Sequence, residues 1–149
     1  VALKTKSYSR LTYSVVLSGV VENYVIDYCG RHESIPAVEN FHFDDAAYED
    51  FIAFAKNQKF DYRSSAKTYY DKMVEEIRKD RIEDSMKEQI EAMGKALDME
   101  KEQVLRLKKD EIRPFIEEEI AVRYYFQSAG ARIRLRYDTE LKEALASQD

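Results

Sequence analysis

The chain has 149 residues, with 24 Lys and Arg against 29 Asp and Glu, so its formal net charge is -5. A chain of this length suits a single domain, which buries roughly two thirds of the surface that its unfolded form exposes. Four Gly and two Pro are few for a turn-rich all-β fold, and a single Cys excludes both an intramolecular disulfide and a cysteine-based zinc site. Eleven Tyr and seven Phe supply material for a core, so the composition argues against intrinsic disorder and indicates a folded helical domain.

The first predicted helix covers residues 9–29 and is apolar around most of its circumference. Gly30 would end it. We expect this helix to contact the domain's own core, a further domain of a longer protein or a second copy of the chain. The candidate interface residues are Val16, Val20, Val21, Tyr24 and Tyr28.

The next segment contains two phenylalanines and a second predicted helix. Phe41 and Phe43 alternate across His42, as either a short strand or a lead-in to the helix. Asp44 or Asp45 would cap this helix. Its apolar stripe consists of Tyr48, Phe51, Ile52 and Ala55.

Two amphipathic helices and one long helix are predicted from residue 64 onward. Ser64 would cap the first, whose apolar residues recur from Tyr69 to Ile77, and the second covers residues 82–97. Asp98 would cap the long helix, which extends to Tyr124.

Two features modify the predicted C-terminal part. Pro114 should kink the long helix, or mark a restart in which Asp110 is the cap. Asp138 would cap a short final helix that ends near Ala146. The sequence therefore predicts an all-α, irregular helical domain of five to seven helices across residues 1–149. Residues 1–8 are read as the end of a preceding domain.

The candidate chemical groups do not form a recognisable catalytic or metal-binding pattern. His32 and His42 lack ligand partners at helical spacing, and no cofactor is expected. Cys29 lacks an activating partner, and Ser18 has no base at a suggestive position. We therefore assign no catalytic, cofactor-binding or metal-binding residue to this chain.

Two charged clusters are interpreted as structural. Glu117, Glu118 and Glu119 are consecutive in a helix and are predicted to form a solvated face, with Arg113 and Arg123 as partners four residues away. Aromatic residues interleave with four arginines, Arg123, Arg132, Arg134 and Arg136. We expect these arginines to pair with the acidic middle helices; the alternative is nucleic-acid binding, which would depend on salt.

Several motifs stand in an order and spacing that resemble a known family. They are Val21–His32, Phe41–Lys56, Lys59–Tyr62 and Glu117–Phe126. Together they resemble the C-terminal helical region of bacterial carboxyl-terminal processing proteases, also called tail-specific proteases, over nearly the whole chain. The block that begins Phe-His-Phe-Asp-Asp at Phe41, joined to the block that begins Glu-Glu-Glu-Ile at Glu117, carries most of this resemblance.

The resemblance implies that the parent protein is an exported serine endopeptidase with a Ser–Lys dyad and an upstream PDZ domain. The chain begins at Val1 rather than Met, so we expect it to be a fragment of that longer precursor. Its role would be docking, oligomerisation or substrate gating, without catalytic residues of its own. Its partners would be the upstream protease and PDZ domains, a second copy, and the polypeptide substrates of the parent enzyme, but not nucleic acid.

The resemblance also implies a periplasmic or exported location, with membrane association only through the precursor. The alternative function is a free-standing helical module that binds a partner helix in a groove. A peptidase domain immediately upstream of Val1 would exclude this alternative.

Overall fold

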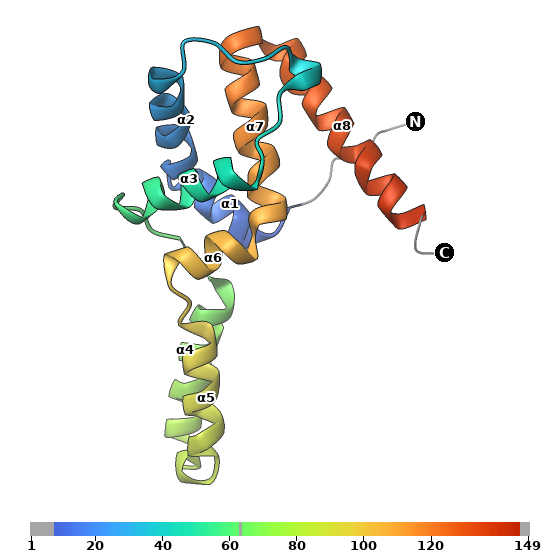
Figure 1. Ribbon diagram of the computed structural model, residues 1–149. Helices are drawn as coiled ribbons and strands as arrows, with labels where there is room; N and C mark the ends of the chain where they lie inside the picture. The colour runs from blue at the N-terminus through green and yellow to red at the C-terminus, as the bar shows by residue number, and fades with distance from the viewer. Residues whose placement is uncertain (1–7, 63, 147–149) are drawn as a thin grey trace.

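The computed structural model describes residues 8–62 and 64–146, which contain eight α-helices, two short 3-10 segments and no strand (Figure 1). The elements in chain order are α1 (Arg10–Leu17), α2 (Val20–Arg31), η1 (Val38–Asn40), α3 (Asp45–Lys56), α4 (Ser65–Lys79), η2 (Glu83–Met86), α5 (Lys87–Leu97), α6 (Lys101–Leu107), α7 (Lys109–Tyr125) and α8 (Gln127–Ala146). The all-α prediction is confirmed, with one helix more than the upper limit expected. Residues 1–8 were read from the sequence as the end of a preceding domain, and the first seven of them lie outside the described residues.

The helices form two parts, which we call the head and the arm. The head consists of α1, α2, α3, α6, α7 and α8, and α7 packs against α1, α2, α6 and α8. The arm consists of α4, η2 and α5, which pack on one another and project from the head (Figure 1). The main cluster of buried apolar side chains lies in the head, so the arm is an appendage of a domain whose core is complete without it.

The predicted helix over residues 9–29 is two helices instead. Gly19 lies between α1 and α2 with φ 92°, a left-handed conformation that glycine adopts without a steric penalty. Gly30, predicted to end the helix, lies within α2, which continues to Arg31. The chain therefore turns at Gly19, well inside the apolar run, and not at Gly30 as the sequence pattern suggests.

The prediction for the segment 41–56 is largely confirmed. Asp44 is the N-cap of α3, and its side chain accepts a hydrogen bond from the Ala47 backbone N–H at 2.8 Å. The four residues of the predicted apolar stripe are all buried. Phe41 and Phe43 are also buried but lie in irregular backbone, and the Phe43 ring packs edge-on against Tyr24 of α2.

The predicted long helix from Asp98 is broken at Lys108 into α6 and α7, which corrects the sequence interpretation. Asp98 is the C-cap of α5, whereas Glu100 caps α6 in a capping box with Gln103. α7 continues through Pro114, and Asp110 lies in its first turn rather than at its cap.

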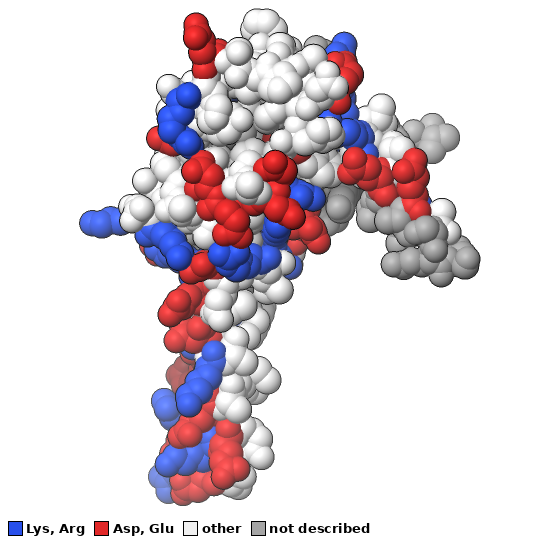
Figure 2. Space-filling model, in the orientation of Figure 1, with Lys and Arg blue, Asp and Glu red and all other residues white. Residues whose placement is uncertain are grey.

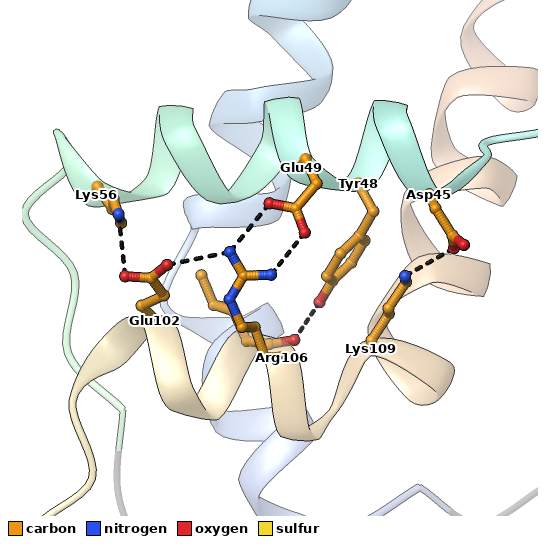
Figure 3. Close-up of polar contacts among 8 residues, drawn as sticks. Asp45, Tyr48, Glu49, Lys56, Glu102, Arg106 and Lys109 are labelled. Carbon is orange, nitrogen blue, oxygen red and sulfur yellow. Dashed lines mark hydrogen bonds and ion pairs between the residues drawn. The ribbon is translucent and has the colours of Figure 1, made fainter.

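The break is stabilised by α3, which packs across α6 (Figure 3). The Tyr48 hydroxyl donates a hydrogen bond to the Leu105 carbonyl at 2.6 Å, one of the last carbonyls of α6, which need a partner where the helix ends. The Arg106 guanidinium donates to both carboxylate oxygens of Glu49, at 2.6 and 3.0 Å. Further ion pairs join Lys56 to Glu102 at 3.0 Å and Lys109 to Asp45 at 2.7 Å.

The C-terminal helix is longer than predicted. α8 begins directly after Phe126, which has φ 69°, and Asp138 lies inside it rather than at its cap. Ile133 is buried in the core of the head and Tyr137 packs against that core one turn later. These contacts with α7 keep the segment around Asp138 helical.

Candidate functional site

The candidate interface residues of α1 and α2 lie mostly inside the head. Val20, Val21 and Tyr24 are buried in its core, and Val16 and Tyr28 are partly buried and packed against that core. The domain's own helices therefore cover most of this surface. A contact of the partly buried pair with another protein stays a prediction.

Tyr24 also anchors α2 to α3 through a polar contact. Its hydroxyl donates to the Asp50 carboxylate at 2.7 Å, and Arg31 donates to the same oxygen at 2.8 Å. Burial, followed by the bond to Asp50, raises the pKa of Tyr24. Burial alone would raise the pKa of Asp50, but the hydrogen bonds from Arg31 and Tyr24 outweigh it and lower that pKa.

Glu117 was predicted to face solvent, and that prediction is wrong. Its side chain is 1% exposed and forms an ion pair with Arg136, while the Tyr137 hydroxyl donates to its other oxygen. Arg136 also donates to the carbonyls of Val38 and Phe41, at 3.3 and 3.1 Å. The Glu117 carboxylate thereby connects α7 to α8, and Arg136 extends this contact to η1 and the residue that follows it.

A cleft of about 270 Å³ lies beside Glu117. Its lining residues include His42, Asp45, Arg113 and Glu140. Arg113 pairs with Asp45 at 3.3 Å, rather than with Glu117 as predicted. Arg136 and Tyr137 each contact one oxygen of Glu117, so this carboxylate joins α7 to α8 at the wall of the cleft.

The remaining candidate residues contact their own neighbours and do not form one reactive centre. The His32 ring stacks on Tyr28 at 3.9 Å, and the Ser18 hydroxyl donates to the Val15 carbonyl within its own helix end. Cys29 is a partly buried free thiol. Across residues 8–62 and 64–146, no group of three His, Cys, Asp or Glu side chains is placed to hold a metal ion.

Two of the four arginines in the aromatic strip pair with the acidic middle helices, as predicted, whereas a third pairs with η1. Arg132 contacts Glu39 at 2.9 Å, Arg134 contacts Glu118 at 3.0 Å, and Arg136 contacts Glu117. Glu117 and Glu118 belong to α7, the acidic helix on which α8 lies. These charges therefore fasten α8 to the head.

An exposed apolar cluster lies on the head, which we call the α1 surface. The Tyr8 ring is 4.6 Å from Phe115 and 6.0 Å from Tyr13, measured between ring centroids. Leu17 follows Tyr13 by four residues on the same side of α1 and is 83% exposed. The sequence pattern did not reveal this surface, because the predicted helix over 9–29 lacked the turn at Gly19 that reorients α1.

The arm is held together by few contacts. The Tyr70 hydroxyl of α4 donates to the Ile90 carbonyl of α5 at 2.7 Å, above Gly94, which leaves room for the Tyr70 ring. Among the described residues of the arm, Val74 is the only buried side chain, and it is still 8% exposed. Because only two helices pack together here, both sides of the arm are exposed to solvent.

The two faces of the arm differ in chemistry. A groove of about 330 Å³ lies between the helices on the charged face, with Arg78, Lys87 and Glu91 in its lining. Figure 2 shows charged side chains along one side of the arm and uncharged ones along the other. We use the name apolar face for apolar residues of the arm that do not line this groove: Ala66, Tyr69, Met73 and Ile77 of α4, with Met86 of η2 and Met93 and Ala96 of α5.

The comparisons with known proteins identify the family. A family model described as the C-terminal helical domain of a probable PDZ-protease matches residues 11–147. The chain belongs to this family. The match covers the head and the arm alike, and the resemblance to a processing protease is confirmed at this level.

The other comparisons and the helices add two separate findings. No curated protein and no solved structure matches this C-terminal helical domain. Within the described part of the chain, none of the helices combines the length and apolar character required to span a bilayer.

Proposed function

We propose that this C-terminal helical domain docks, through its α1 surface, onto the protease and PDZ domains of a carboxyl-terminal processing serine endopeptidase. The domain would hold a fixed position on the protease and PDZ domains and would contribute no catalytic residues. A Ser–Lys dyad would belong to the rest of that enzyme. The proposal includes an exported or periplasmic location, which follows from the resemblance alone.

The observation that carries the proposal is the exposure of Leu17 beside an aromatic cluster. A large aliphatic side chain that is 83% exposed, one helical turn after Tyr13, whose ring contacts Phe115, forms the type of apolar surface that marks an interaction site. The surface is fixed in place, because Glu111 of α7 binds the first turn of α1 through Ser9 and Thr12. A rigid surface loses little conformational entropy on binding.

The test measures binding of this chain to the separately purified PDZ and protease domains by isothermal titration calorimetry. The Leu17→Glu variant should weaken binding by about tenfold or more, since it places a charge in a desolvated contact. Ile82→Glu, an equally simple change of an exposed apolar residue at the tip of the arm, serves as the control and should have little effect. Equal affinities of wild type and Leu17→Glu would overturn the proposal, as would the absence of any binding by wild type.

A further inference from the structure

The apolar face of the arm is a continuous feature of two helices. Ala66, Tyr69, Met73 and Ile77 recur at three and four residues along α4 and so share one side of it. The groove on the opposite side is lined by charged residues of both α4 and α5. The charged sides of the two helices therefore lie on the same face of the arm. The uncharged flank of α5, with Met93 and Ala96, therefore lies beside that of α4.

Nothing in the described chain covers this face. Tyr69 is 69% exposed, Met73 is 47% exposed and Met93 is 51% exposed. The helices of the arm pack on each other and on η2, while the buried cluster of the head excludes their side chains. A two-helix hairpin of this length gains little from its own contacts, so an added apolar partner would stabilise it.

The composition of the face fits occupants of varied shape. Three of the four methionines of the chain, Met73, Met86 and Met93, lie on it. Methionine is flexible and polarizable, and surfaces rich in it adapt to partners of different sequence. The seven residues that define the face are uncharged, so their contacts select for apolar character and not for charge.

The size of the face argues against a second copy as the occupant. α4 has fifteen residues, which makes the face about 22 Å long and, at two helices wide, roughly 450 Å² in area. Each partner in a standard interface contributes about 800 Å². Two arms that met through this face alone would bury about half of that, whereas one short segment of polypeptide fits the available width.

We propose that the apolar face of the arm binds apolar segments of unfolded polypeptide chains. Tyr69 supplies a rigid anchor, and the methionines adapt to the side chains of the bound segment. The biological role of this binding rests on the proposed function, because the bound chains would be the polypeptide substrates of the parent endopeptidase.

The experiment titrates this chain into a fluorescein-labelled peptide whose leucines recur every three or four residues, with fluorescence anisotropy as the readout. A matched peptide with serine in place of leucine should not bind. The combined variant Tyr69→Ser, Met73→Gln and Met93→Gln should raise Kd by about tenfold or more. The control variant Glu75→Gln, Lys79→Gln and Glu91→Gln, on the charged face, should leave Kd within about twofold. Raising NaCl from about 0.05 M to about 0.5 M should change the affinity little, since no charges are involved.

Three results would overturn the proposal. One is unchanged peptide binding by the combined variant, and another is loss of binding by the charged-face control. The third is a wild-type dimer in sedimentation velocity that the combined variant converts to monomer, because the occupant would then be a second copy. If the combined variant does not fold, amide hydrogen exchange of wild type decides the question: the peptide must slow exchange in α4 and α5, and unchanged exchange refutes binding there.

These results are independent of the docking test. The peptide titration uses this chain alone. The docking test instead measures binding of the wild type and of Leu17→Glu to the separate PDZ and protease domains. Peptide binding without docking would contradict only the proposed function, and docking without peptide binding would contradict only this inference.

Discussion

The carboxylate of Glu111, in α7, accepts a hydrogen bond at 2.7 Å from the backbone N–H of Ser9, which lies 102 residues earlier in the chain. The hydroxyls of Ser9 and Thr12 donate to its second oxygen at 3.2 and 3.1 Å. α1 has eight residues and no acidic side chain in its first turn. Such a short helix is unstable by itself, so Glu111 supplies both hydrogen-bond acceptors and a favourable charge at its N-terminus.

Replacing Glu111 by Gln should destabilise the domain by about 2 kcal/mol, because hydrogen bonds to a charged group are lost or weakened. The free energy of unfolding from urea denaturation measures this change. Asp110→Asn is the control: this neighbour is exposed and should cost about 0.5 kcal/mol or less. Equal stabilities of the two variants would show that the Glu111 contacts add nothing.

Replacing Tyr48 by Phe should cost about 1–3 kcal/mol, because it leaves the buried Leu105 carbonyl without its hydroxyl donor. Tyr69→Phe removes an equivalent hydroxyl from an exposed ring and should be nearly neutral in the same denaturation experiment. Indistinguishable curves for wild type and Tyr48→Phe would mean that water replaces the lost donor.

Replacing Arg136 by Met should destabilise the domain by about 3–5 kcal/mol, since it leaves the Glu117 carboxylate buried without a cation. Arg132→Met breaks the exposed pair with Glu39 and should cost about 1 kcal/mol or less. Adding Glu117→Leu to Arg136→Met should restore much of the stability, because the uncompensated charge is then gone. A double variant as unstable as the single one would argue against this cause.

The domain should lose stability in acid. Five carboxylates have a pKa below the ordinary value in the folded state, because hydrogen bonds or ion pairs outweigh the effect of burial: Asp45, Glu49, Asp50, Glu102 and Glu111. Groups with a lowered folded pKa stabilise the fold above their unfolded values, about 3.9 for Asp and 4.3 for Glu. That contribution disappears as the pH falls through the lower folded values.

Thermal unfolding followed by circular dichroism measures this dependence. Tm should be nearly constant from pH 7 to about pH 5 and should fall steeply below about pH 4. The Glu111→Gln variant should show a smaller fall than wild type, because it has one fewer carboxylate to protonate. A Tm that rises on acidification would contradict the sign of these shifts.

Local sequence signals were sufficient for the elements that depend on neighbours in the chain. Asp44 and Ser64 cap α3 and α4 as predicted, because a capping side chain reaches only the backbone two or three residues ahead. The apolar stripe from Tyr48 to Ala55 is buried as predicted, because helical periodicity places its members on one side. The motifs around Phe41 and Glu117 likewise indicated the family that the comparison identifies.

The sequence by itself determined that the protein is all-α, where the helices α3, α4 and α5 lie, and that arginines of α8 pair with acidic residues of the domain. Only the tertiary structure decided that the long helix breaks at Lys108, because the carbonyl left free at Leu105 is satisfied by Tyr48, 57 residues away. It also decided that Glu117 is buried, since Arg136 reaches it from another helix. Periodicity describes one helix at a time, whereas burial, charge pairing and the open face of the arm depend on which helices meet in space.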